Sequence, residues 1–277
     1  SCEAMMQDNK ALQAGTSHNL GQNFAKAFDL KFQTEAGDTA FAWNTSWGVS
    51  TRLIGGLVMT HGDDNGLRIP PLLAPIECVI VPIWRTDEER ARVLEAADRI
   101  AARLGDWERR EPNALRIKVD ARENLKPGAK YYEWEMRGVP LRMELGPRDL
   151  DKNQAVLVRR DTRAKQAVPL ESIGEEIQAL LQLIQDDMLA AARERRERHS
   201  RRGPITYDEF KAVMEGEGAF VYAGWCGRAE CEARIKEETK ATIRCLPDEE
   251  FRSAEPPTTC LLCGAPATDE ALWARAY

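Results

Sequence analysis

The sequence lacks a long apolar run, a basic leader and an excess of positive charge. No segment of its 277 residues approaches the roughly 18 consecutive apolar residues that a membrane-spanning helix needs. The first residues, 1–7, contain no basic region followed by an apolar stretch, so they do not form a secretory signal peptide. They also lack an initiator Met, as we expect of a fragment or a processed chain. These absences predict a cytoplasmic protein with no membrane partner.

The charge balance is acidic. A formal net charge of -6 at pH 7 excludes a polycation that coats nucleic acid without regard to sequence, although local basic patches remain compatible with RNA binding. The hydrophobic share of 43% is typical of globular proteins that bury real cores. The chain contains no internal repeat and no low-complexity tract, and its length favours two or three domains.

Changes in residue pattern divide the chain into three segments. Residues 1–75 mix glycine, polar and aromatic side chains and end in a proline-rich stretch that is typical of a linker. Residues 76–175 alternate apolar strand patterns with amphipathic helix patterns, which predicts an α/β domain of about 100 residues. Residues 176–277 hold a smaller module with most of the cysteines. The fold class expected is therefore a multidomain mixture of α+β and α/β architecture.

Several local signals support the central α/β segment. Residues 77–83 form a near-continuous apolar run, which predicts a strand that is covered on both faces. Thr86 and Glu89 form a capping box at the start of a helix that Gly105 ends. Further strands are predicted at 115–119, 141–145 and 155–158. Pro127 begins a second helix, which is predicted over 127–138. A long amphipathic helix with an acidic start and a basic end is predicted over 173–198.

Four cysteines form two close pairs near the C-terminus, Cys226 with Cys231 and Cys260 with Cys263. A structural zinc site takes four tetrahedral ligands, commonly thiolates delivered as two short knuckles. Four buried or free thiols are the alternative. Four thiolates would leave no open position on the metal, so the ion would stabilise a small module and would not catalyse.

The other three cysteines do not share this spacing. Cys245 lies in an apolar strand pattern, and we expect it, Cys2 and Cys78 to belong to cores and not to a metal site. Reduced thiols are the expectation for an odd cysteine count with no secretion signal.

Short polar residues gather around glycines in the first segment. Gln13, Thr16 and His18 flank Gly15 and could bind a small polar ligand, although from these residues alone a glycine-rich turn with a capping hydroxyl is favoured. Residues 45–48 precede Arg52, which could stack on a base, clamp a phosphate or form a surface ion pair. The run 61–64 suggests metal ligands, but its spacing fits no usual finger, so a loop is favoured.

Several strings in this order resemble prolyl-tRNA synthetases of the archaeal/eukaryotic-like type, which are class II aminoacyl-tRNA synthetases. The strings that carry the resemblance are Ala11–His18, Gly21–Phe24, Thr45–Gly48 with Arg52, and His61–Leu67. The resemblance continues through the α/β segment and the cysteine module to Tyr277. It implies the C-terminal part of an antiparallel-sheet catalytic domain at 1–75, an α/β anticodon-binding domain at 76–175, and a small α+β zinc-binding domain with its linking helix at 176–277.

The resemblance also implies roles for individual residues. Gln13 and Thr16 would bind ATP, and Arg52 would stack on adenine and neutralise phosphate charge as the arginine of the third class II motif. His18 would line the proline pocket, and it is the second catalytic candidate beside Arg52. The remaining implied positions are the proline-pocket residues Ser46, Trp47 and Gly48, the anticodon-contacting residues Glu135, Arg142, Arg148, Asp149 and Lys165, and Tyr277, whose family counterpart folds back toward the active site.

The implied function is ATP-dependent activation of L-proline and its transfer to tRNA(Pro), with Mg bound to ATP, a structural Zn and a homodimer in the full-length enzyme. The first two class II motifs are absent from this sequence, so we expect the isolated chain not to activate proline. One alternative is a non-catalytic tRNA-binding or accessory module that retains a remnant synthetase site. Another is a zinc-stabilised nucleic-acid-binding protein that uses the basic run 193–202, which the acidic balance disfavours.

Overall fold

The computed structural model describes residues 1–105 and 114–277. The chain forms two compact units, which we call unit 1 (residues 1–60 and 195–277) and unit 2 (residues 61–194). Within the described ranges, every helix is too short or too polar to span a lipid bilayer. This division differs from the three consecutive segments expected from the sequence, because the first and last parts of the chain share one unit.

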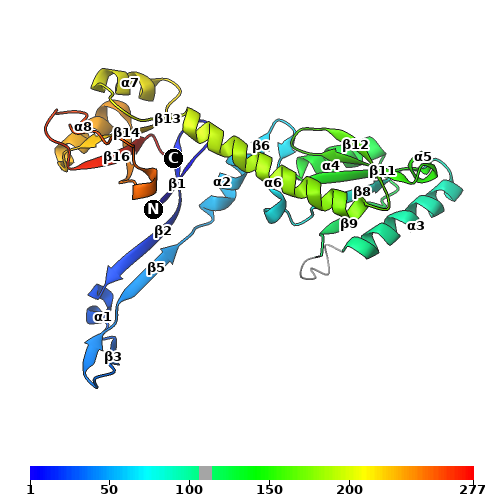
Figure 1. The fold of residues 1–277 in the computed structure, drawn as a ribbon, viewed down its shortest axis with the longest axis horizontal. Helices are drawn as coiled ribbons and strands as arrows, with labels where there is room; N and C mark the ends of the chain where they lie inside the picture. The colour runs from blue at the N-terminus through cyan, green and yellow to red at the C-terminus, as the bar shows by residue number, and fades with distance from the viewer. Residues whose placement is uncertain (106–113) are drawn as a thin grey trace. The chain divides into compact units, whose positions relative to one another are not determined.

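Unit 2 is built on a mixed five-stranded sheet with strand order β12-β11-β10-β8-β9 (Figure 1). Strands β8, β9 and β10 are parallel, whereas β11 and β12 run antiparallel beside them. The elements of this sheet and its connections are β8 (Cys78–Pro82), α3 (Asp87–Leu104), β9 (Ile117–Val119), α4 (Pro127–Met136), β10 (Leu141–Leu145), α5 (Pro147–Asp151), β11 (Gln154–Arg159), β12 (Lys165–Pro169) and α6 (Ile173–Arg198).

The two faces of this sheet are covered by different helices. One face packs against α3 and α6 in the main core, through residues such as Ile80, Met143 and Ile177. The other face carries a smaller apolar cluster in which Trp134 of α4 covers Val79 and Val81. Because both faces are covered, β8 is buried along its whole length, as its apolar run predicts.

Most of the predicted elements of unit 2 are confirmed. The Thr86–Glu89 capping box is present, Gly105 caps the end of α3, and α6 has the predicted bounds. Strand β12 escaped prediction, because most of its residues are exposed and show no alternation. Helix α5 is a short helix of five residues between the predicted strands at 141–145 and 155–158.

A small hairpin of β6 (Gly62–Asp63) and β7 (Gly66–Leu67), followed by the 3-10 helix η1 (Pro71–Leu73), precedes this sheet. Asp63 accepts two hydrogen bonds from the buried Arg160 guanidinium, at 3.0 Å from Nη1 and 2.7 Å from Nη2. Arg68 lies 3.6 Å from the same carboxylate. Asp63 therefore anchors the hairpin within unit 2. Where the sequence favours a loop for 61–64, the structure has the end of α2 (Arg52–His61), strand β6 and the start of a turn.

Unit 1 contains a four-stranded sheet with strand order β13-β14-β16-β15. Its elements are β13 (Ser200–Arg201), α7 (Tyr207–Glu215), β14 (Phe220–Trp225), α8 (Ala229–Thr239), β15 (Thr242–Cys245), the 3-10 helix η2 (Glu249–Phe251) and β16 (Asp269–Ala274). Helices α7 and α8 pack on one face through Phe210, Ile235 and the fully buried Trp273.

The N-terminal strands of unit 1 pack on the other face of this sheet. They are β1 (Cys2–Met5) and β2 (Ala11–Gly21), and their side chains Met5 and Ala11 join a buried cluster with Phe220 and Leu272. Arg244 donates two hydrogen bonds of 3.0 Å to the Glu3 carboxylate beside them. This packing explains why the ends of the chain form one compact unit.

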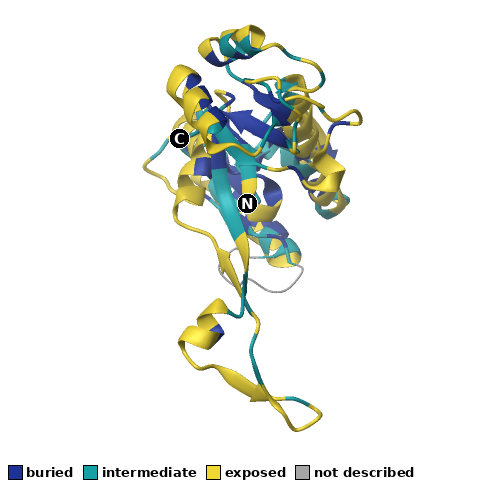
Figure 2. Ribbon diagram, turned by 90° about the vertical axis from the view of Figure 1, so that its left-hand side faces the viewer, coloured by how far each residue is buried: buried dark blue, intermediate teal, exposed yellow. Residues whose placement is uncertain are grey.

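Beyond this contact, β2 continues alongside β5 (Asn44–Gly48) to a tip formed by α1 (Asn23–Ala27), β3 (Lys31–Gln33) and β4 (Thr39–Phe41) (Figure 1). Most residues of the tip are exposed, including Phe28 at 77% and Trp43 at 71% (Figure 2). Helix α2 (Arg52–His61) follows β5. The tip therefore exposes several large apolar side chains close together in the sequence.

The Asp63–Arg160 ion pair predicts that the free energy of unfolding falls at acidic pH. Hydrogen bonds from Arg160 lower the pKa of Asp63 to about 2 from 3.8. Because the folded-state pKa is depressed, the contribution is complete above the unfolded value and disappears as the pH falls from 3.8 through 2. We expect Asp63→Asn to reduce the free energy of unfolding by about 1–2 kcal/mol at pH 7, and by less at pH 3.

Urea unfolding at the two pH values measures this difference. The neighbouring Asp64→Asn variant removes the same charge from an exposed side chain and should behave like the wild type. An equal loss of stability at pH 7 and pH 3 for Asp63→Asn would contradict the prediction.

Candidate functional site

The antiparallel pairing of β2 with β5 brings together the residues suggested for the small-molecule site. Thr16 lies opposite Gly48, Ser17 opposite Trp47, and His18 opposite Ser46. These positions are about thirty residues apart in the sequence, and the regular register places them side by side (Figure 1).

Strand geometry distributes these side chains over two faces. Successive side chains of a strand point to opposite faces, so Thr16, His18 and Ser46 share one face, whereas Trp47 lies on the other. The pairing of β1 with β2 shifts register between Cys2–Gly15 and Glu3–Gln13, so the count from Thr16 does not place Gln13 on the face of Trp47. Trp47 is 79% exposed, and His18 and Ser46 are also exposed. The pair of strands β2 and β5, which we call the β2–β5 hairpin, thus has two exposed faces, one with polar side chains and one with the indole of Trp47.

Arg52 opens α2, four residues after Gly48. Its backbone N–H donates to Ser50 Oγ at 3.3 Å, and its side chain is exposed. An exposed guanidinium at this place can meet a phosphate or an aromatic ring that approaches β5.

The end of the chain returns to the beginning of β2. Ala276 forms a parallel bridge with Ala11, and the backbone N–H of Tyr277 donates to Ala11 O at 3.3 Å. The Lys10 ammonium lies 5.0 Å from the centre of the Tyr277 ring. Burial and a hydrogen bond to Asp8 raise the pKa of the Tyr277 phenol to about 12. Tyr277 is therefore held at the turn that leads into the strand of Gln13 and Thr16.

The four cysteines of the two pairs form one cluster. Their Sγ atoms all lie within 4.8 Å of one another, with Cys226 at 3.6 Å from Cys231 and 3.7 Å from Cys263. Four sulfurs at about 2.3 Å from a common centre would stand roughly 3.8 Å apart in a tetrahedron, so the spacing fits one metal ion. Cys231 and Cys260 are buried, and Cys263 is exposed. The cluster can hold a metal ion.

The local backbone favours a thiolate at Cys260, whereas burial raises the pKa of the Cys231 thiol to about 12. Gly227 and Gly264 follow the first and last cysteines with φ of 75° and 69°, which lets each knuckle turn tightly. Burial opposes ionisation of Cys260, but hydrogen bonds from the backbone amides of Cys263 and Leu262 lower its pKa to about 7. Hydrogen bonds of this kind support a thiolate, which is the form that binds metals.

The remaining cysteines lie outside this cluster. Cys78 is fully buried in the main core of unit 2, as expected, and burial raises the pKa of its thiol to about 12. Cys245 is half-buried in β15 and packs against the second cluster of unit 1. The expectation that Cys2 belongs to a core is wrong, because it is exposed at the first position of β1.

Three of the five suggested anticodon-contacting residues meet on one face of the unit 2 sheet. Arg142 of β10 donates to Glu135 of α4 at 2.5 Å and to Glu144 at 3.0 and 3.2 Å. Lys165 of β12 lies 3.2 Å from the same Glu144 oxygen. The guanidinium of Arg142 lies 4.0 Å from the centre of the Tyr131 ring. We call these five residues the Arg142 cluster.

Sequence reasoning missed Glu144 and Tyr131. The signal for Glu144 was available, because it stands two positions after Arg142 on a predicted strand and so shares its face. Tyr131 stands four positions before Glu135, one helical turn away. Burial and the Glu144 charge raise the pKa of the Tyr131 phenol to about 12, so the ring stays neutral.

The other two suggested residues, Arg148 and Asp149, lie on α5. Asp149 accepts a hydrogen bond of 2.9 Å from the backbone N–H of Gly146 and so caps its own helix. Arg148 is exposed. None of the hydrogen bonds that form the Arg142 cluster involves either residue.

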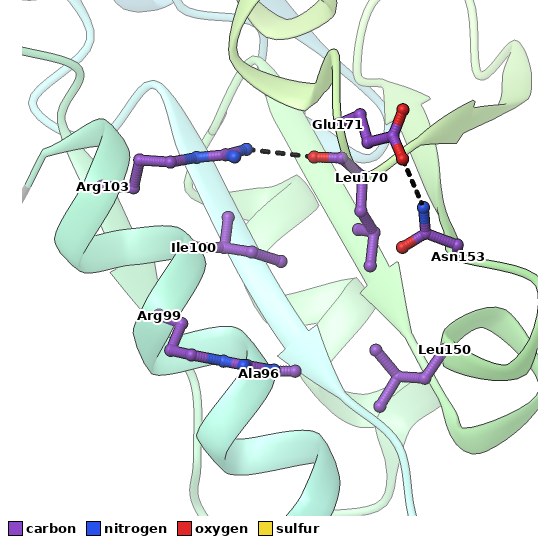
Figure 3. A pocket seen from close by; sticks show the side chains of 8 residues that line it. All are labelled: Ala96, Arg99, Ile100, Arg103, Leu150, Asn153, Leu170 and Glu171. Carbon is purple, nitrogen blue, oxygen red and sulfur yellow. Dashed lines mark hydrogen bonds between the residues drawn. The ribbon is translucent and has the colours of Figure 1, made fainter.

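A pocket of about 420 Å³ lies on the α3 side of unit 2 (Figure 3). Arg99 and Arg103 of α3 line it together with apolar residues, but Arg103 already donates to Leu170 O at 3.0 Å. The Glu171 carboxylate also lines the pocket, where it accepts from Asn153 at 3.4 Å. This mixture of charges selects no class of ligand.

Comparison with known families and proteins agrees with this geometry. Residues 77–180 match the model of an anticodon binding domain, and residues 207–277 match the model described as "Prolyl-tRNA synthetase, C-terminal". The chain is 48% identical over 278 residues to a proline–tRNA ligase of Roseiflexus sp. (strain RS-1), covering 99% of this chain and 55% of that protein.

Two further relatives give the same result. A proline–tRNA ligase of Flavobacterium johnsoniae and proline–tRNA ligase 2 of Clostridioides difficile (strain 630) are each 47% identical, with 99% of this chain and 54% of each relative covered. The chain thus spans about half the length of the curated relatives it matches, and it belongs to the prolyl-tRNA synthetase family, whose C-terminal portion it represents.

Proposed function

We propose that this chain is the portion of a proline–tRNA ligase that recognises the anticodon of tRNA(Pro) and supplies one wall of the site where proline and ATP react. The observation that carries this proposal is the register of β2 against β5. It sets Thr16, His18 and Ser46 on one face of the strand pair, and Arg52 follows four residues after the end of β5. The relatives named proline–tRNA ligase align across this hairpin and across the Arg142 cluster, since they cover 99% of the chain.

The reaction proposed has two steps. The carboxylate oxygen of proline attacks the α-phosphorus of ATP, which gives prolyl-adenylate and releases pyrophosphate. A hydroxyl of the terminal adenosine of tRNA(Pro) then attacks the prolyl carbonyl and releases AMP. In this proposal Arg52 neutralises charge that grows on the α-phosphate, while Gln13 and Thr16 bind the nucleotide, which carries Mg as a substrate complex.

The proline pocket proposed lies around the hairpin. His18, Ser46 and Gly48 would contact the amino acid from one face, and the indole of Trp47 would give a flat apolar wall. Trp47 lies on the opposite face of the β2–β5 hairpin from His18. One proline molecule can therefore touch both side chains only at the edge of the strand pair, or a neighbouring segment must supply one of the two contacts.

For the cysteine cluster we propose structural zinc. Four thiolates complete a tetrahedral shell and leave no open position, so the ion would stabilise the fold and take no part in the reaction. The remainder of the proposal, by analogy with the relatives, is a homodimer that acts in the cytoplasm.

The zinc proposal predicts a stoichiometry and a loss of stability. The purified chain should contain one zinc per molecule by atomic emission, and Cys260→Ser should lose most of it and unfold at a lower temperature. The exposed Cys2→Ser variant removes a thiol outside the cluster and should retain both metal and stability. Full thermal stability of metal-free Cys260→Ser protein would reject a structural ion.

The exposure of the β2–β5 hairpin to solvent predicts that the 277-residue chain alone does not activate proline. Trp47, His18 and Arg52 are exposed, and a site open to water weakens the electrostatic stabilisation that the first step needs. We expect proline-dependent ATP–pyrophosphate exchange at background level. Exchange at the rate of a full-length relative would contradict this expectation.

The Arg142 cluster predicts anticodon-dependent RNA binding by the same chain. Arg142→Ala should reduce the preference for tRNA(Pro) over a transcript with one anticodon guanine changed to adenine by about 5–100-fold. Filter binding with both transcripts measures this preference. An accessory RNA-binding module would show binding with no anticodon preference in the wild type.

A further inference from the structure

Arg142 has already committed most of its hydrogen-bond donors inside the protein. A guanidinium carries five N–H groups. Nε and Nη2 each donate one to Glu144 Oε1, and Nη1 donates one to Glu135 Oε1. One N–H therefore remains on each of the two terminal nitrogens. That pair is what a bidentate contact with guanine O6 and N7 requires.

The surroundings of Arg142 fix the direction in which this pair points. The Tyr131 ring lies under the guanidinium at 4.0 Å, and carboxylates stand on two of its sides. Only 9% of the side-chain surface of Arg142 is exposed. An incoming base can therefore reach this residue over a small area, which suits the edge of a base better than its face.

Glu144 is the residue that links the cluster. Its carboxylate accepts two hydrogen bonds from Arg142 of its own strand, and it pairs with Lys165, which projects from β12 two strands away in the sheet. The Glu144 side chain is 14% exposed, so its charge is only partly screened by water. A carboxylate beside an RNA-binding surface repels the RNA polyanion, so Glu144 must contribute something other than affinity for RNA.

We propose that Glu144 is a positioning residue for anticodon recognition, which holds Arg142 and Lys165 in the geometry that selects guanine at the cost of overall RNA affinity. The inference rests on the proposed function of this surface. Glu144 need not touch the RNA, because both cations that it orients belong to the proposed contact set.

Glu144→Gln separates positioning from a general structural role. The amide removes one negative charge and weakens the hold on both cations, while its volume is nearly unchanged. We expect the preference for the guanine-containing tRNA(Pro) transcript to fall by roughly 5–10-fold, and the affinity for the adenine-substituted transcript to stay equal or rise. Damage to the fold would instead lower both affinities together.

Two further variants complete the measurement. Glu171→Gln makes the same charge change in the pocket of Figure 3, away from the cluster, and should preserve the preference. Glu144→Asp keeps the charge but withdraws the carboxylate, so it should relax the preference even if Glu144→Gln folds poorly. Thermal unfolding of each variant shows which of them is folded.

A double variant distinguishes failure of this inference from failure of the proposed function. In the Arg142→Ala background, Glu144→Gln should change the preference by less than it does in the wild type, because only Lys165 remains for Glu144 to orient. If Arg142→Ala alone leaves the wild-type preference intact, the proposed role of the surface is wrong. If Arg142→Ala removes the preference while folded Glu144→Gln and Glu144→Asp keep it, the positioning role of Glu144 is wrong.

Discussion

The pairing of buried arginines organises unit 2. A guanidinium cannot lose its charge at any ordinary pH, so burying one costs several kcal/mol unless carboxylates surround it. Arg142, Arg159 and Arg160 are all buried around the ends of β10 and β11, and each has a carboxylate partner. The partners come from three separate elements, because Asp63 lies on β6, Glu135 on α4 and Asp187 on α6. The same requirement that fixes these elements also builds the surface proposed to recognise RNA.

How far the sequence predicted this structure depends on whether the signal was local. The capping box at Thr86, the apolar run of β8 and the bounds of α6 were predictable, because each follows from neighbouring residues and their periodicity. The thiol cluster was predictable because two short cysteine spacings suffice. Strand β12 and the bridge between Ala11 of β2 and Ala276, after β16, were not, since edge pairing and contacts between distant segments leave no periodic trace.

The candidate sites show the same limit. The resemblance implies that Arg142 and Lys165 contact the anticodon, and strand alternation already places Glu144 beside Arg142. The link from Glu144 to Lys165, however, depends on the placement of β10 and β12 in one sheet. The Asp149 carboxylate caps α5 through a local hydrogen bond, and its contact with the anticodon stays a prediction. For the hairpin, sequence placed Thr16, His18 and Trp47 in one site, whereas the register separates Trp47 from the other two by a strand face.

In unit 1, backbone hydrogen bonds connect the thiol cluster to the candidate small-molecule strands. Leu261, between the two cysteines of the second knuckle, donates its N–H to Gly224 O of β14, and a β-carbon at Gly224 would lie 2.2 Å from Thr259 O. Only glycine permits that approach of the knuckle to the sheet. β14 pairs along its length with β16, and the residues after β16 pair with Ala11 at the start of β2. A chain of backbone hydrogen bonds therefore runs from the thiol cluster through β14 and β16 to the residues that hold Tyr277 at the turn before Gln13.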